Sequence, residues 1–243
     1  MKYVEYGKTG KKVSVIGFGG MRFRKEDYEK DFAKSAQVVR RASELGINYF
    51  DTAPFYCDDK SELIMGEAFK DMPNPFYVST KSSIKHEKTA DEVRARIEKS
   101  LKRMNLDKIN FFHMWCILNL EQYRNIMKPG GPYEGALKAK EEGLIDHIVF
   151  STHCNGEEIE TIVNEGHFEG VTLGYNATNF AFRQKGIKAA HEKGLGVVTM
   201  NPLGGGIIPQ NPEYYSFIKE NEKDTLVQAA LKFNVSHKEI TIA

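Results

Sequence analysis

Residues 76–115 read FYVSTKSSIKHEKTADEVRARIEKSLKRMNLDKINFFHMW, and this stretch decides the fold. It opens and closes with short β-branched or aromatic runs, Phe76–Thr80 and Asn110–Trp115, which are typical of buried strands. Between them, Thr89–Met104 has the period of an amphipathic helix. The apolar residues of its one face are Val93, Ile97, Leu101 and Met104. Thr89, with a glutamate three residues later, predicts a capping box at the helix start, so the stretch is one strand–helix–strand unit.

The same alternation of strand and helix runs along the rest of the chain. The predicted strands are Ser14–Phe18, Asn48–Asp51, Phe76–Thr80, Asn110–Trp115, His147–Ser151, Val171–Tyr175, Gly196–Met200 and Glu239–Ile242. The predicted helices are Asp31–Leu45, Ser61–Met72, Thr89–Met104, Glu134–Glu142, Glu157–Asn164, Phe182–Glu192 and Thr225–Phe233. This alternation implies a parallel sheet with helical crossovers, because parallel strands need long connections. Eight such strands favour an α/β fold of the closed (β/α)8 type, a TIM barrel, over an open sheet.

Both ends of the chain add detail to this barrel. Val4–Val13 contains a turn signal, Lys8-Thr9-Gly10-Lys11, which predicts a small hairpin that plugs the barrel floor. The sequence stops at Ala243, so we expect the last loop and helix after strand eight to be absent and the outer face of that strand to be uncovered. We expect residues 1–243 to form a single barrel domain, and the uncovered strand leaves association into an oligomer open.

Composition narrows the possible partners. The formal net charge is +1 and no block of five or more like charges occurs, so nothing indicates binding to nucleic acid or to an acidic membrane. The N-terminal residues are too charged for a signal peptide, and the longest uncharged run, Gly194–Pro212, is broken by prolines and glycines. Three widely spaced cysteines, Cys57, Cys116 and Cys154, argue against a disulfide framework. We therefore expect a cytoplasmic protein.

Four residues that can carry chemistry lie near the carboxyl ends of predicted strands, where barrel enzymes place their active sites. Asp51 ends the second strand, Tyr56 follows in the next loop, Lys81 directly follows the third strand, and His113 lies within the fourth. Each of them alone has an ordinary explanation: a loop-capping aspartate, an amphipathic loop tyrosine, a solvated lysine or a buried core histidine. Their order along the chain is more specific than any one of them.

These residues and their neighbours, in this order, resemble the aldo-keto reductase family. The matching motifs are Gly17-Phe18-Gly19-Gly20-Met21, Asp51-Thr52-Ala53-x-x-Tyr56, Ser61-Glu62-x-x-x-Gly66-Glu67-Ala68, Ser79-Thr80-Lys81, His113, Gly143-Leu144-Ile145-Asp146-His147-Ile148 and Pro202-Leu203-Gly204-Gly205-Gly206. The resemblance covers essentially the whole chain. It implies an enzyme, an oxidoreductase that reduces a small-molecule aldehyde or ketone to an alcohol.

The resemblance implies a catalytic tetrad of Asp51, Tyr56, Lys81 and His113. In this arrangement Tyr56 would protonate the substrate oxygen as hydride reaches the carbonyl carbon. A free tyrosine, with a pKa of about 10, is a poor acid at neutral pH, and a nearby ammonium group lowers that pKa. Lys81 would supply the ammonium group and Asp51 would anchor it. His113 would hydrogen-bond the substrate oxygen and orient it.

The resemblance also implies NADPH or NADH as the cofactor. The residues that it places against the cofactor are Gly20, Met21, Ser151, Met200, Asn201, Pro202, Leu203 and Gly204. Three positions depart from the common family pattern: Thr152 stands where an asparagine usually follows the serine, Thr172 where a glutamine is frequent, and Met200 where an aromatic residue often stacks on the nicotinamide. The family usually grips the adenosine phosphate with residues after strand eight, so the resemblance does not choose between the two nucleotides here.

The tripeptide Ser151-Thr152-His153 resembles a bacterial and archaeal branch of these reductases. Members of that branch often continue into a C-terminal iron–sulfur module, which this sequence does not contain. Its three scattered cysteines do not have the close spacing that such clusters need.

Three other interpretations stay open at this point. The barrel could be catalytically silent and act as a binding or interaction module. Asp51, His113 and His153 could instead belong to a metal-dependent hydrolase, although no fixed spacing of metal ligands is present. The three cysteines could also bind a soft metal together with these two histidines, but strand-end cysteines are more often buried small residues, and we predict no metal site.

Overall fold

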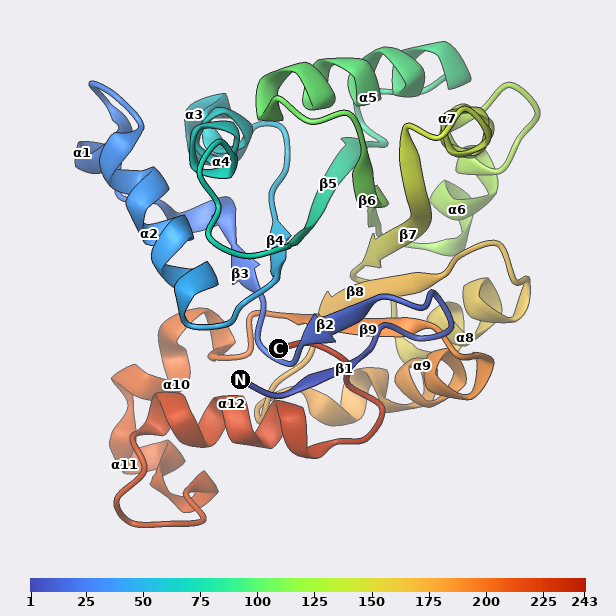
Figure 1. The fold of residues 1–243 in the computed structure, drawn as a ribbon. Coiled ribbons are helices and arrows are strands. Elements are labelled where there is room, and N and C mark those ends of the chain that lie inside the picture. Colours follow the sequence, from blue (N-terminus) through green and yellow to red (C-terminus); the bar gives the residue numbers. More distant parts are fainter.

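The computed structural model describes residues 1–243, and their strands form the wall of a barrel (Figure 1). Seven strands form one parallel sheet in chain order: β3 (Phe18–Gly19), β4 (Tyr49–Asp51), β5 (Tyr77–Ser83), β6 (Ile109–Ile117), β7 (Ile145–Thr152), β8 (Gly170–Gly174) and β9 (Gly196–Met200). Residues 241–243 lie between the two edges of this sheet. The Thr199 amide donates to the Ile242 carbonyl at 2.8 Å, and the Ala243 amide donates to the Val15 carbonyl at 2.9 Å. The predicted TIM barrel is confirmed.

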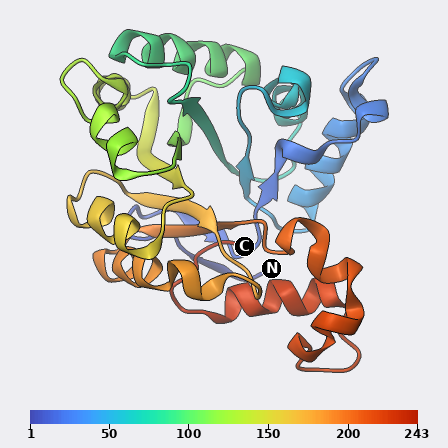
Figure 2. The same ribbon diagram turned by 180° about the vertical axis from the view of Figure 1, so that it is seen from behind.

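A helix follows each strand and packs on the outside of the wall (Figure 2). These helices are α2 (Ala33–Glu44), α4 (Ser61–Phe69), α5 (Ala90–Met104), α7 (Pro132–Glu141), α8 (Gly156–Asn164), α9 (Phe180–Lys193) and α12 (Leu226–Ser236). Short elements fill the connections: η1 (Gly20–Arg22), α1 (Lys25–Tyr28), α3 (Tyr56–Asp59), α6 (Leu120–Ile126), η2 (Gly204–Gly206), α10 (Ile207–Gln210), α11 (Pro212–Tyr215) and η3 (Ser216–Ile218). None of the helices combines the length and the apolarity needed to cross a membrane.

The strand–helix–strand unit at residues 76–115 forms as its sequence predicts. The Glu92 amide donates to the Thr89 hydroxyl, and the Glu92 carboxylate accepts from the Thr89 amide, which completes the capping box of α5. Val93 and Ile97 on the inner face of α5 are fully buried. They join the main apolar core, which lies between the sheet and its helices. The apolar period therefore decides which face of α5 meets the barrel.

The predicted hairpin closes the barrel floor. Strands β1 (Tyr3–Glu5) and β2 (Lys12–Ser14) pair antiparallel. Tyr6, just after β1, is fully buried, and its ring lies 4.2 Å from the ring of Phe111 in the barrel wall. A Cβ on Gly196 would lie 2.2 Å from the Tyr6 ring, so the wall has no side chain where this ring inserts. The floor is thus a packed plug.

Three predicted elements are wrong in detail. Ser14–Phe18 is not one strand, because Ser14 pairs with Tyr3 in the hairpin and only the last of these residues enters the barrel sheet. The predicted strand Glu239–Ile242 reduces to one parallel bridge at Ile242, since the closing segment is too short for a full ladder. The strand predicted to end before Lys81 continues to Ser83, so Lys81 lies inside β5.

Candidate active site

The four predicted catalytic residues come from three adjacent strands and one loop. Asp51 ends β4, Lys81 lies in β5, His113 lies in β6, and Tyr56 begins α3 after β4. The strand register places Asp51 beside Ser79 and Lys81 beside His113. Side chains on alternate positions of these strands point into the barrel, so the register brings the polar groups together.

Asp51 and Lys81 form a close ion pair. The Lys81 Nζ atom lies 2.6 Å from each carboxylate oxygen of Asp51, and it also donates to the Thr52 carbonyl at 2.7 Å. The lysine side chain is 4% exposed and that of Asp51 25%. Burial alone would lower the pKa of Lys81, but the negative charge of Asp51 opposes burial, and the net pKa is raised. The ammonium group therefore stays charged and fixed.

Tyr56 lies over this ion pair. The Lys81 Nζ atom is 5.3 Å from the centre of the Tyr56 ring, and the ring of Trp115 meets Tyr56 edge-on with 5.6 Å between centres. Burial raises the pKa of Tyr56, Lys81 lowers it and Asp51 raises it, with a net increase. Lys81 lowers the pKa of Tyr56 as predicted, but the effect of burial, which raises this pKa, is larger. The phenol is thus kept protonated across the neutral range.

The turn that carries Tyr56 has an unusual backbone. Phe55, Cys57 and Asp58 all have positive φ angles, at 69°, 53° and 54°, so α3 is not a regular helix. The Cys57 thiol lies 3.4 Å from the carbonyl oxygens of Gly20 and Met21. These contacts tie the tyrosine turn to η1, the 3-10 turn that follows β3.

His113 is fully buried and bonded on both ring nitrogens. Its Nδ1 atom lies 3.1 Å from the Ser79 hydroxyl, and its Nε2 atom lies 2.8 Å from the Thr172 hydroxyl. Burial, followed by the charge of Lys81, lowers the pKa of His113 to about 3, so the ring is neutral at working pH. Sequence reasoning missed both hydroxyl partners. The position of Thr172, where a glutamine was expected, was the only signal available.

The predicted cofactor residues lie at strand ends and on loops at the same end of the barrel. Ser151 is buried near the end of β7, where its hydroxyl accepts from the Cys116 amide at 3.1 Å. Met200 ends β9. The side-chain amide of Asn176 donates to the Asn201 carbonyl at 2.9 Å, and the sequence analysis did not predict a role for Asn176. Pro202 and Leu203 lead into η2. Asn176 therefore joins the loops after β8 and β9.

Two glycine segments flank this region. Gly204 begins a run of three glycines with positive φ angles, at 63°, 69° and 101°, and a Cβ on Gly205 would meet nothing within 4 Å. The backbone of this loop is open to a ligand, which glycine permits. Gly20 is instead buried against Ser61, while the neighbouring Met21 is 49% exposed. Of this pair, Met21 presents the side chain that can touch a ligand.

The cysteines do not converge on one position. Cys57 faces the carbonyls of η1, and Cys154 is buried with its thiol 3.7 Å from the Ile117 carbonyl. No group of three His, Cys, Asp or Glu side chains is arranged to hold a metal ion. The soft-metal site and the hydrolase therefore have no ligand set in this structure.

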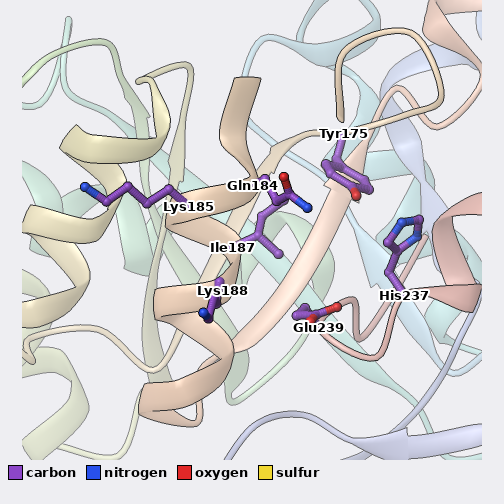
Figure 3. A pocket seen from close by; sticks show the side chains of 7 residues that line it. All are labelled: Tyr175, Gln184, Lys185, Ile187, Lys188, His237 and Glu239. Atoms are coloured by element: carbon purple, nitrogen blue, oxygen red, sulfur yellow. The ribbon is translucent and has the colours of Figure 1, made fainter. Parts of the chain in front are cut away.

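A cavity of about 490 Å³ lies outside the barrel, between α9 and the segment after α12 (Figure 3). Its lining residues are Tyr175, Gln184, Lys185, Ile187, Lys188, His237 and Glu239. None of the four catalytic candidates and none of the predicted cofactor residues belongs to this set. The cavity is therefore separate from the candidate active site.

Comparisons with known proteins identify the family and the fold of this chain. The sequence pattern described as "Aldo/keto reductase family" matches residues 15–242. L-galactose dehydrogenase from Arabidopsis thaliana is 27% identical over 97% of this chain and 80% of its own length. Aflatoxin B1 aldehyde reductase member 2 from Rattus norvegicus is 26% identical over 76% of this chain, which spans about half of it (51%). A holo aldo-keto reductase structure from Bacillus halodurans superposes with a TM-score of 0.81 at 19% identity, over 100% of this chain and 85% of that one.

Proposed function

The chain belongs to the aldo/keto reductase family and is an oxidoreductase of that family, and we propose that it reduces an aldehyde or ketone to an alcohol with NADPH or NADH. The observation that carries this proposal is that Lys81, at the carboxyl end of the barrel, pairs with Asp51 and also faces the ring of Tyr56. A buried ammonium group held between a carboxylate and a phenol suits proton delivery to an oxygen that becomes negatively charged.

We propose the following roles for the site residues. When bound, the nicotinamide supplies the hydride that forms the new C–H bond. Tyr56 gives its hydroxyl proton to the carbonyl oxygen, so the C=O double bond becomes a C–OH single bond and a phenolate remains until water reprotonates it. Lys81 stabilises that phenolate, and Asp51 holds Lys81 by two contacts of 2.6 Å. The same steps reversed oxidise an alcohol.

The cofactor would lie across the carboxyl ends of β7 and β9 and along the loop after β9. Ser151 would face the nicotinamide, with Met200, Asn201, Pro202 and Leu203 along the ring. The glycine loop that begins at Gly204 would approach the pyrophosphate at Gly205, where no side chain lies within 4 Å of a Cβ position. The Gly204 and Gly206 amides donate instead to the carbonyls of Asn201 and Leu203. Gly20 and Met21 would border the ring from the loop after β3. These residues fit the cofactor chemically, and none of them selects a phosphorylated over an unphosphorylated ribose.

The substrate class is proposed from the same site. The edge-on Trp115 beside Tyr56 and the exposed Phe55 supply apolar walls for a small carbonyl compound. One relative is named for a sugar and another for an aldehyde, which supports a small aldehyde, ketone or sugar-like substrate. We also propose that residues 1–243 act as one barrel domain in a reducing, cytoplasmic setting, since all three cysteines are free.

Cofactor binding and the Tyr56→Phe variant test the proposal. Ligand at a hundred times its Kd stabilises a folded protein by about 2.7 kcal/mol, so NADPH or NADH should raise Tm by roughly 5–10 °C. Tyr56→Phe should then lower kcat for carbonyl reduction by about 10²-fold or more with little change in Tm. Tyr3→Phe on the barrel floor is the matched control and should keep full activity. Absence of both the Tm shift and turnover would favour a catalytically silent binding module.

A further inference from the structure

A chain of polar contacts begins at Thr80, the residue before Lys81 in β5, and leads to Arg103 in α5. The Thr80 hydroxyl donates to Glu62 Oε1 at 2.7 Å, and Glu62 Oε2 lies 3.0 Å from Arg103 Nε. The Glu62 side chain is fully buried and that of Arg103 is 14% exposed. The guanidinium group has little freedom to move, because its departure would leave a buried carboxylate without a partner. Arg103 is therefore a fixed point beside the barrel wall.

The far end of Arg103 binds Asp59, the last residue of the tyrosine turn, which comprises residues 55–59. Nη1 donates to Asp59 Oδ2 at 3.2 Å, and Nη2 donates to Asp59 Oδ1 at 3.2 Å and also to the Asp59 carbonyl. The same Oδ1 atom accepts from the Phe55 amide at 3.2 Å. One arginine thus holds both the carboxylate and the main chain of Asp59, and that carboxylate closes the turn onto the residue before Tyr56.

The tyrosine turn depends on contacts from outside, because four of its five residues have positive φ angles. These residues are Phe55 (69°), Cys57 (53°), Asp58 (54°) and Asp59 (62°). None of them is glycine, and residues in such conformations keep them only where the surrounding structure holds them. The other hydrogen bonds of its side chains are longer: the Cys57 thiol lies 3.4 Å from two carbonyl oxygens of η1, and Asp58 accepts from Tyr28 at 3.4 Å.

We propose that Arg103 is a positioning residue that holds the tyrosine turn through Asp59 and so fixes the Tyr56 ring over the Lys81 ammonium group. This inference rests on the proposed function, because Tyr56 and Lys81 are its proton donor and its charge. One end of the contact chain is next to Lys81 in β5, and the other is next to Tyr56 in the turn. The distance of 5.3 Å between Lys81 Nζ and the centre of the Tyr56 ring therefore depends on this chain.

Asp59→Ala tests the contact from the side of the turn. Arg103 keeps its partner Glu62 in this variant, so the fold should survive. We expect kcat for carbonyl reduction to fall about tenfold or more, because a displacement of about 1 Å near the reacting groups can cost about a hundredfold. The Kd of NADPH or NADH should not change, since the loop after β9 is untouched. Asp59→Asn keeps an oxygen that can accept from Arg103 and Phe55, and it should lose much less.

Asp58→Ala is the matched control. It places alanine at almost the same backbone conformation, with a φ of 54° beside 62° for Asp59. The Asp58 side chain is 62% exposed and does not contact Arg103, so this variant should keep its kcat. A loss in Asp58→Ala equal to that in Asp59→Ala would overturn the proposal, because backbone conformation alone would then explain both.

Arg103→Lys tests the contact from the side of α5. A lysine keeps a positive charge beside Glu62, but it has no planar group that can bind Glu62 and Asp59 together. We expect kcat to fall as it does in Asp59→Ala. The double variant should lose little more than the weaker of the two single variants, because both changes remove the same contact. Fully additive losses would overturn the proposal.

The fluorescence of Trp115 reports the position of Tyr56 without any turnover. Trp115 is the only tryptophan of the chain, and its ring meets Tyr56 edge-on with 5.6 Å between centres. Tyr56→Ala gives the emission maximum of an uncovered Trp115. We expect Asp59→Ala and Arg103→Lys to shift the emission at least halfway toward that value, and Asp58→Ala to leave it unchanged. An Asp59→Ala variant that emits like the unmodified enzyme would overturn the proposal, whatever its kcat.

The two readouts keep this inference distinct from the proposed function. If the unmodified enzyme reduces no carbonyl compound, the proposed function fails while the emission of Trp115 still shows whether Arg103 and Asp59 hold the turn. If Arg103→Lys does not fold, the comparison of Asp59→Ala with Asp58→Ala still decides the question.

Discussion

Replacing Lys81 by methionine tests the electrostatic core of the proposed mechanism. The methionine fills most of the volume of the lysine side chain but removes the charge that lies 5.3 Å from the centre of the Tyr56 ring. Two unit charges about 5 Å apart at an effective dielectric constant of about 20 interact by about 3 kcal/mol. This energy corresponds to about two pKa units of Tyr56, so we expect kcat to fall about a hundredfold.

The assay is steady-state carbonyl reduction at saturating cofactor, with Lys70→Met, an exposed position directly after α4, as the matched control. Asp51 keeps its contact with Ser79 and is partly exposed, so Lys81→Met should remain folded. The double variant with Asp51→Asn should lose little more than Lys81→Met alone, because the two residues act through one interaction. A kcat within about threefold of the unmodified enzyme, in protein that still binds cofactor, would refute this reasoning.

Three further predictions concern stability and are read by urea denaturation. Tyr6→Ala should destabilise the fold by about 3–5 kcal/mol, because the ring is fully buried in the barrel floor, while Tyr6→Phe should keep most of that stability. Thr89→Ala should cost about 1 kcal/mol through loss of the capping box, and Thr89→Ser should cost much less; equal losses would exclude the cap as the cause. Burial raises the pKa of Glu169, but hydrogen bonds from His147 and Lys140 outweigh it and lower the pKa to about 2. This contribution is present above the unfolded pKa of about 4.3 and is lost as pH falls toward 2, so Glu169→Gln should flatten that part of the acid-unfolding profile and leave the pH dependence above 5 unchanged.

The sequence predicts those features that are specified locally. The start of α5 follows from Thr89 and Glu92, and its buried face follows from the apolar period, so both predictions are confirmed. The four predicted catalytic residues lie near the ends of strands that β-branched runs predict. In a parallel barrel the carboxyl ends of all strands lie at the same rim, so these residues are expected to be close together. The fold could therefore be predicted from patterns shorter than about 20 residues.

Features that depend on the register across the barrel could not be predicted. The Thr172 hydroxyl and the His113 ring are 59 residues apart in sequence and lie on strands that are not neighbours, so no local pattern links them. The contact between Asn176 and the Asn201 carbonyl has the same origin. The tyrosine turn is also missed, because positive φ angles at Phe55 and Cys57 are unusual for residues other than glycine.

The candidate site contains two sets of residues, the proposed proton-transfer groups and the residues proposed to hold the cofactor, and the elements that carry them differ. Asp51, Lys81 and His113 are fixed by β4, β5 and β6, and Tyr56 lies on the turn after β4, where its ring faces the Lys81 Nζ atom. Half of the residues proposed to hold the cofactor, Asn201, Pro202, Leu203 and Gly204, follow β9 on a loop where Asn201 and Gly205 are exposed. Loops tolerate substitution far better than strands that share one hydrogen-bond ladder. Cofactor affinity and substrate choice can therefore change in this barrel while the ion pair of Asp51 and Lys81 on β4 and β5 stays the same, which makes that pair a better guide to the reaction type than the loops are.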